Sequence, residues 1–267
     1  MGPSTYLVTN RCFKILKPTR CICQHFRYHN GLGFNRPNTF SEEYKTLYTH
    51  TTVLQKVVLS IGSSVVSLLD PTRGDMISIL GEVSGERALR HMHKTLLDSE
   101  EGSMILRETP RISSKTIDLQ KLKSLPEGTV GKVYHNFLEQ NKVSPDSRLP
   151  VQFVDDVELA YVMQRYRETH DLNHAVLGMP TNMLGEVTVK WVEAFHTQLP
   201  MCFGGALFGA MRFRSKQRQK YITRYLPWAI QTGLNSKPLL CVYFEKRWEQ
   251  PISELHKELN IVPLEPV

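Results

Sequence analysis

The spacing of hydrophobic residues along the chain predicts a mainly α-helical protein. Apolar residues recur every three to four positions through Thr51–Leu69, Ala88–Leu97 and Thr129–Gln140, as they do on one face of a helix. A further helix is expected from Pro71 to about Gly81, because proline suits the first turn of a helix. Few segments alternate between apolar and polar residues as strands do, so we expect a multi-helix fold.

Three segments interrupt the helical pattern. Leu106–Leu125 contains Thr109-Pro110 and is expected to form a loop with short turns, and the two prolines of Ser144–Pro150 exclude a helix there. Leu239–Phe244 is the best strand prediction, although a buried helix gives the same apolar run. No segment beyond these breaks is long enough to bury a core of its own. Residues 42–267 are therefore predicted to form a single helical domain.

Two apolar segments raise the question of membrane contact. Lys56 and four serines lower the hydrophobicity of Thr51–Leu69, which favours a buried helix over a membrane span. Leu199–Phe213 is apolar and contains several small residues. The basic residues that follow it are Arg212, Arg214, Lys216, Arg218, Lys220 and Arg224. A short apolar helix beside basic residues suits an anionic membrane surface, and a core helix with a solvated basic face is the alternative.

Positive charge gathers at the N-terminus. The formal net charge is +7, but residues 1–41 hold six basic residues and no acidic one, which leaves 27 basic against 26 acidic residues elsewhere. A basic, acid-free segment with serine and threonine is typical of a mitochondrial targeting segment, so residues 1–41 are predicted to be removed or disordered. A basic tail is the alternative. No arginine and aromatic pattern of an RNA-binding module accompanies the charge, so no nucleic-acid partner is expected.

Cysteine usage agrees with a reducing compartment. Cys12, Cys21 and Cys23 fall in the predicted targeting segment, and only Cys202 and Cys241 follow. These five cysteines do not show the spacing of a disulfide framework. Cys21 and Cys23 also lack the second pair of cysteines or histidines that a zinc site needs.

The most informative segment is residues 155–196, which predicts two helices joined by a short link. The residues expected to begin and end them are, in order, Asp155 or Asp156, Gly178 with Pro180, Thr181 or Asn182, and His196. A link this short makes the two helices an antiparallel pair.

This helix pair carries a potential metal site. His170 and His174 are four residues apart, so their side chains project from one face of the first helix. Both lie on its apolar stripe, where an unpaired imidazole is costly. Glu186 lies early on the second helix and is brought back toward the histidines. Two imidazoles and a carboxylate on facing helices fit a divalent metal ion, although histidine pairs with this spacing are also common by chance.

Asp171 directly follows the first histidine. It occupies the place of the glutamate in the His-Glu-x-x-His helix of zinc proteases. A helix turns by about 100° per residue, so Asp171 does not point where His170 points. Three roles stay open for it: a fourth ligand at a frayed helix end, a general base, or a partner that fixes an imidazole.

A longer motif surrounds the two histidines. Residues 165–174 read RYRETHDLNH, and eleven residues then lead to Glu186. Further segments of this kind are PTRGDM (71–76), GE (81–82), PDSR (145–148), DDVELAYVM (155–163), LPMC (199–202) and VYFEKRWE (242–249). Together they span roughly residues 44–261 and closely resemble the coenzyme Q (ubiquinone) biosynthesis family whose founder is the fourth member of the yeast Coq series.

The resemblance implies zinc held by His170, Asp171, His174 and Glu186. It implies removal of the ring C1 carboxyl from a polyprenylated 4-hydroxybenzoate-type intermediate, such as 4-hydroxy-3-methoxy-5-polyprenylbenzoate, and leaves open whether C1 is hydroxylated in the same event. It also implies a peripheral protein on the matrix side of the mitochondrial inner membrane. Its expected partners are the other ubiquinone-biosynthesis proteins of a multi-subunit complex, with a homodimer also allowed.

Three functions are compatible with these features. In a zinc-dependent decarboxylase, the metal takes up charge as CO₂ leaves, and Asp171 or Glu186 is the catalytic residue that handles the proton. A non-catalytic lipid-binding scaffold with a structural metal is the alternative, because four protein ligands exceed the three usual for catalytic zinc. A metallohydrolase of the His-Glu-x-x-His kind is the weakest hypothesis. Aspartate is shorter than glutamate and extends less far toward a metal-bound water. The prenyl tail needs an apolar groove, for which Thr51–Leu69 and Leu199–Phe213 are the expected walls.

Overall fold

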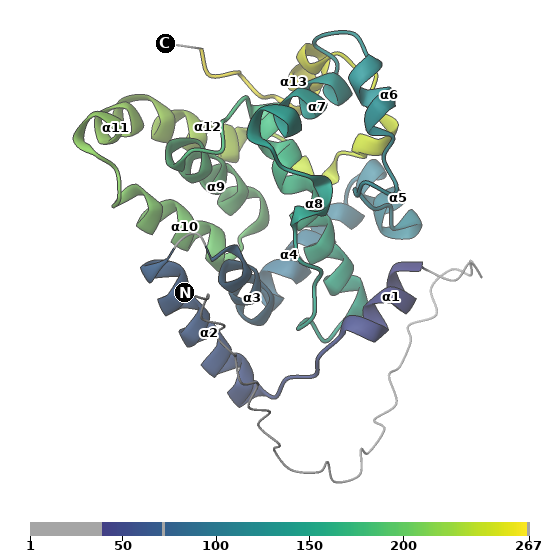
Figure 1. The fold of residues 1–267 in the computed structure, drawn as a ribbon, viewed down its shortest axis with the longest axis vertical. Coiled ribbons are helices and arrows are strands. Elements are labelled where there is room, and N and C mark those ends of the chain that lie inside the picture. Colours follow the sequence, from purple (N-terminus) through teal and green to yellow (C-terminus); the bar gives the residue numbers. More distant parts are fainter. Residues whose placement is uncertain (1–38, 71–72, 266–267) are drawn as a thin grey trace, which may run out of the picture. The chain divides into compact units, whose positions relative to one another are not determined.

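The computed structural model describes residues 39–70 and 73–265, and its fold is shown in Figure 1. The α-helices of this part of the chain are α1 Thr39–Leu47, α2 Val53–Leu69, α3 Gly74–Ser84, α4 Glu86–Leu97, α5 Glu100–Glu108, α6 Leu119–Ser124, α7 Val130–Asn141, α8 Val157–Leu177, α9 Met183–Thr197, α10 Pro200–Ala210, α11 Ser215–Lys220, α12 Leu226–Asn235 and α13 Ile252–Leu259. Short 3-10 turns and one π-helical turn connect some of them.

The mainly helical single domain that the sequence predicts is confirmed. Within residues 39–70 and 73–265 no strand forms, and one isolated bridge joins Thr129 to Pro251. Helix α1 begins inside the segment predicted for targeting, because Phe40 and Tyr44 are buried in the core. The preceding part of that segment, which contains its three cysteines, lies outside the described residues. The predicted helix start at Pro71 also lies outside them.

Local signals set the bounds of the helix pair α8 and α9, as predicted. Asp156 caps α8 by accepting hydrogen bonds from two backbone N–H groups, and Asn182 caps α9 in the same way. Helix α8 ends where Gly178 adopts the left-handed conformation, with φ of 65°. The N–H of Met179 then donates to the carbonyl of His174 at 2.9 Å, which closes a Schellman-type turn.

Two predictions about interruptions need correction. Leu239–Phe244 is not a strand, because 3-10 turns form at Leu239–Cys241 (η3) and Phe244–Lys246 (η4). Its backbone bonds to side chains instead of a neighbouring strand: Arg165 Nη2 donates to the carbonyl of Val242 at 3.1 Å. The expected loop at Leu106–Leu125 is shorter than predicted, since α5 and α6 occupy its two ends.

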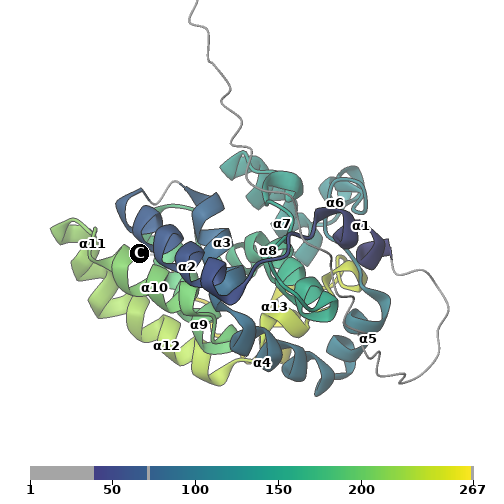
Figure 2. The same cartoon turned by 90° about the horizontal axis from the view of Figure 1, so that it is seen from below.

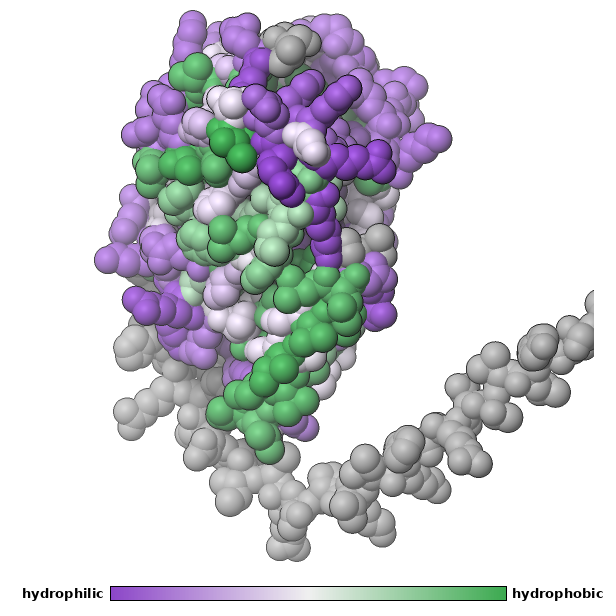
Figure 3. All heavy atoms as spheres, turned by 90° about the vertical axis from the view of Figure 1, so that its left-hand side faces the viewer, coloured by the Kyte–Doolittle hydropathy of each residue, from purple (hydrophilic) through white to green (hydrophobic). Residues whose placement is uncertain are grey.

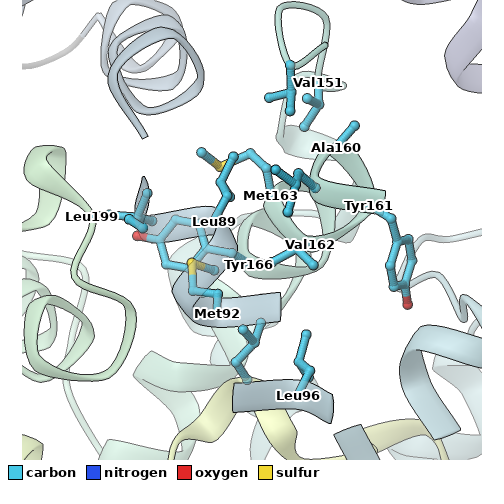
Figure 4. Packing of buried hydrophobic residues seen from close by; sticks show 14 of the residues in the cluster. Leu89, Met92, Leu96, Val151, Ala160, Tyr161, Val162, Met163, Tyr166 and Leu199 are labelled. Carbon is cyan, nitrogen blue, oxygen red and sulfur yellow. The ribbon is translucent and has the colours of Figure 1, made fainter. Parts of the chain in front are cut away.

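Helix α8 forms the centre of the core. All residues from Leu159 to Leu177 are buried, so the helix is enclosed on every side rather than on one stripe. It contacts α4, α7 and α9, which lie beside it in both Figure 1 and Figure 2. Figure 4 shows Leu89 and Met92 of α4 gathered with Met163 and Tyr166 of α8. A second apolar cluster surrounds the C-terminal end of α8, so His170 lies between the two.

The expectation that Thr51–Leu69 is a buried helix is wrong. Of the residues in α2, only Ser63 is buried. The apolar residues with exposures between 41% and 81% are Val53, Leu54, Val57, Val58, Ile61, Val65, Leu68 and Leu69. Periodicity identifies the apolar face of a helix but not whether another segment covers it, and here α2 packs mainly on α3. Figure 3 shows the uncovered face as a green band in its lower part.

No helix within residues 39–70 and 73–265 is both long enough and apolar enough to cross a membrane. Helix α10 is shorter than the predicted segment Leu199–Phe213. Its buried residues Cys202 and Ala206 join it to the core, whereas Leu207 and Phe208 are exposed.

Candidate metal centre

Three of the four predicted ligands come together between α8 and α9. Nitrogen atoms of His170 and His174 and a carboxylate oxygen of Glu186 all lie within 4.8 Å of one another. The Glu186 Oε2 atom is 3.6 Å from His170 Nε2 and 3.4 Å from His174 Nε2. Ligand atoms at zinc distances and tetrahedral angles are separated by about 3.3 Å, so these three side chains fit one ion.

The two imidazoles present their Nε2 atoms to the same point. His170 and His174 have ring centroids 4.9 Å apart and perpendicular planes. Both rings are buried, and 35% of the Glu186 side chain is exposed. The site is therefore closed on the α8 side and reaches solvent past Glu186.

The turn after α8 orients His174. Its Nδ1 lies 3.1 Å from the carbonyl oxygen of Met179. A carbonyl can only accept, so Nδ1 carries a proton, and Nε2 of the neutral ring keeps its lone pair. Nε2 is buried and has no hydrogen-bond partner. An unpartnered buried nitrogen is costly, and a metal ion facing Glu186 would remove that cost.

Glu193 holds His170 in the corresponding way. Its Oε1 lies 2.6 Å from His170 Nδ1, which leaves Nε2 of this ring facing Glu186. Burial by itself lowers the pKa of His170, but the charge of Glu193 outweighs it and raises that pKa. Burial likewise favours a raised pKa for Glu193, yet His170 and Lys190 hold it well below its ordinary value.

Glu186, a predicted ligand, has a carboxyl group that favours its ionised form. Burial acts to raise its pKa, but the two imidazoles, when protonated, outweigh burial and hold the pKa below its ordinary range. A carboxylate that is already ionised can bind a cation without first losing a proton.

Asp171 lies outside the three-residue cluster. Its Oδ1 accepts from Arg148 Nη2 at 2.5 Å, and the Asp171 carboxylate is buried while 38% of the Arg148 side chain is exposed. The rotation of about 100° per helical residue turns it away from His170, as the sequence indicates. The structure pairs Asp171 with Arg148, a contact that is not among the three roles left open by the sequence.

Sequence reasoning does not identify Glu193, Lys190 or the Met179 carbonyl. A signal for Glu193 is present in the sequence, because it follows Glu186 by seven residues and so lies on the same face of α9. Lys190 falls between them on that face. The Met179 carbonyl carries no side-chain signal at all.

Comparison with known proteins identifies the family. Residues 44–265 match the family described as coenzyme Q (ubiquinone) biosynthesis protein Coq4. A Bombyx mori protein named ubiquinone biosynthesis protein COQ4 homolog, mitochondrial, is 57% identical over 238 residues, which cover 89% of this chain and 92% of that protein. An Aedes aegypti protein of the same name is 56% identical over 222 residues, which cover 83% and 81%.

A solved structure shares the fold. The crystal structure of a protein from Nostoc punctiforme PCC 73102, described as a putative ubiquinone biosynthesis protein, matches with a TM-score of 0.60 at 20% identity. The match covers 75% of this chain and 95% of that one. On the match across residues 44–265 and on relatives that are more than half identical, this chain belongs to the Coq4 family of coenzyme Q (ubiquinone) biosynthesis proteins.

Proposed function

We propose that this protein is a zinc-dependent carbon–carbon lyase that removes the ring C1 carboxyl from a polyprenylated 4-hydroxybenzoate-type intermediate of ubiquinone biosynthesis. Family membership supports the pathway. The observation that carries the metal is His174 Nε2, which is buried without a hydrogen-bond partner and faces Glu186 beside His170. A divalent ion is the partner that two imidazoles and a carboxylate share.

His170, His174 and Glu186 would hold the ion. Three protein ligands leave a coordination position open, as catalytic zinc sites do, and this supports a catalytic over a structural metal. The bound ion would supply a Lewis acid for the negative charge that develops as CO₂ leaves. The exposed part of Glu186 marks the side from which a substrate would reach the site.

Asp171 is the proposed proton carrier. The bond between C1 and its carboxyl carbon breaks, CO₂ leaves, and the electron pair that stays on the ring takes a proton at C1. Our sequence-based prediction also makes Asp171 a fourth ligand. Its ion pair with Arg148 holds the carboxylate apart from the three clustered ligands, so as a proton carrier it would take the proton of the substrate's carboxyl group and return it to C1.

We also propose a peripheral position on the matrix side of the mitochondrial inner membrane, among the other ubiquinone-biosynthesis proteins of a complex. The relatives in Bombyx mori and Aedes aegypti are named mitochondrial. The exposed apolar face of α2 supports contact with lipid, as do Leu207, Phe208 and Met211 at the end of α10. Arg212 Nη2 donates to the carbonyl of Leu68, so the end of α2 adjoins the start of the basic stretch. Apolar surface beside basic residues fits an anionic lipid surface.

The same apolar face favours a second function, a non-catalytic lipid-binding scaffold with a structural metal. One assay separates the two. Purified protein loaded with zinc is incubated with the prenylated acid carrying an isotope label in its carboxyl group, and labelled CO₂ is measured. Release that stops when a chelator removes the metal is expected for the lyase. Folded, zinc-loaded protein that releases no CO₂, alone and with its complex partners, would leave the scaffold as the function.

A further inference from the structure

We infer that Glu193 is a positioning residue of the metal centre, which holds His170 in the tautomer whose Nε2 lone pair faces the ion. The inference rests on the metal site proposed above. It extends that site by a residue that does not touch the metal and acts through a ligand.

Glu193 is buried among hydrogen-bonding side chains. Only 2% of it is exposed. Its Oε1 lies 2.6 Å from His170 Nδ1 and accepts from Asn173 Nδ2 at 2.9 Å. Its Oε2 accepts from the Tyr166 hydroxyl and from Lys190 Nζ, each at 2.7 Å. Four polar hydrogens therefore converge on one carboxylate.

This environment fixes the proton on His170. The Asn173 amide donates to Oε1, and the Tyr166 hydroxyl and Lys190 Nζ donate to Oε2, so both oxygens of Glu193 act as acceptors. The hydrogen shared between Glu193 and His170 must then come from Nδ1. Nε2 of a neutral His170 consequently carries a lone pair, and it points at Glu186 at 3.6 Å.

The two histidines show that this arrangement serves the metal rather than only the core. His174 is held at Nδ1 by the Met179 carbonyl, and His170 is held at Nδ1 by Glu193. Different acceptors on different elements thus give both rings the same tautomer and turn both Nε2 atoms to one carboxylate. A network that only neutralised Lys190 would not need His170 to present Nε2 to Glu186. A hydrogen-bond acceptor at the other ring nitrogen is the usual means of orienting a metal-binding imidazole.

Zinc affinity tests the inference with a matched control. Glu193→Gln keeps the size of the side chain but removes the charge that fixes the proton, so zinc affinity should fall by about 10-fold to 100-fold. Glu82→Gln is the control, because Glu82 is also buried and ion-paired, and its partners are Arg167 at 2.5 Å and the backbone N–H groups of Gln152 and Phe153 rather than an imidazole. It should lose stability and keep its zinc affinity. The inference would be overturned if Glu193→Gln and Glu82→Gln lost the same stability and also lost the same zinc affinity.

Nitrogen NMR of the metal-free wild-type protein gives a readout that does not depend on zinc or on the variant folding. At a pH where the ring is neutral, His170 should be protonated at Nδ1, and Glu193→Gln should show a mixture of tautomers. An Nε2–H tautomer in the wild type would overturn the inference. Wild-type protein that binds no zinc but shows the Nδ1–H form would refute the metal site and leave the role of Glu193 in fixing the tautomer intact.

Discussion

The carbonyl oxygen of Pro180 lies 1.9 Å from the position that a Cβ atom on Gly185 would take. Pro180 belongs to the turn after α8, and Gly185 to the first turn of α9. The missing side chain therefore lets α9 begin directly against that turn. This close approach brings the next residue, Glu186, to 3.4 Å from His174.

Gly185→Ala should weaken the metal centre through the backbone. The new methyl group cannot share space with a carbonyl oxygen, so α9 must shift and Glu186 moves with it. We expect a loss of about 1 to 3 kcal/mol in the free energy of unfolding and weaker zinc binding. Gly62→Ala on exposed α2, where nothing lies within 4 Å of the new Cβ, should instead stabilise by about 0.5 to 1 kcal/mol. Urea unfolding and zinc titration of both variants check this, and unchanged zinc affinity in Gly185→Ala would contradict it.

Metal analysis tests the two histidine ligands. Purified wild-type protein should contain about one divalent ion per chain, most of it zinc, and His170→Ala with His174→Ala should abolish it because two of three ligands are gone. His196→Ala is the control, because His196 is also buried but its Nε2 lies 3.1 Å from the Ser236 hydroxyl. A double variant that keeps its full metal content, with circular dichroism showing a helical fold, would refute the site.

Paired measurements of activity and stability test Asp171 and Glu186. Glu186→Gln should lower both zinc content and CO₂ release, because a neutral amide is a poorer ligand. Asp171→Asn should lose CO₂ release and keep its zinc, because the amide cannot carry the proton but the three ligands remain. A structural metal predicts a different result, in which activity falls only in proportion to the thermal midpoint. Full activity in folded Asp171→Asn protein would exclude Asp171 as the proton carrier.

Liposome binding tests the basic stretch after α10. Charge reversal at Arg214, Lys216 and Lys220 should reduce binding to anionic vesicles more than 10-fold at low salt, since each basic residue near such a surface contributes about 1 kcal/mol. Added salt should screen the wild-type binding. Charge reversal at Lys121 and Lys123 of α6 is the control. Equal binding by both sets of variants would leave the basic stretch as a solvated face.

The free energy of unfolding should depend on pH through the protonation of His196. Burial lowers its pKa to about 4, against a smaller opposing effect of the Glu193 charge, and its ordinary value is 6.5. The unfolded chain therefore binds a proton at a higher pH than the folded protein does, so stability is lost as pH falls from about 6.5 to about 4. The shift corresponds to a loss on the order of 3 kcal/mol. His196→Gln, compared with wild type in metal-free urea unfolding across this range, should remove that part of the slope. Identical slopes would show that His196 titrates normally.

The bounds of α8 and α9 could be predicted because their signals are local. Asp156 and Asn182 bond to backbone groups two and three residues away, and Gly178 adopts a conformation that costs glycine little. The spacing of His170 and His174 is equally local, since four residues make about one helical turn. These features do not depend on the rest of the chain.

What surrounds those elements is decided by tertiary packing. Glu193 reaches His170 across 23 residues of sequence, and Arg148 reaches Asp171 across the same number, because the helices and the loop pack at particular positions. Hydrophobic periodicity identifies the apolar face of α2, but only the fold shows that no described segment covers Leu54 or Ile61. The sequence by itself thus determines the bounds of α8 and α9 and which residues share one face of a helix. The packed structure decides which ligands meet, which acceptors orient them and which apolar face stays exposed, because those contacts depend on the distance between segments far apart in the chain.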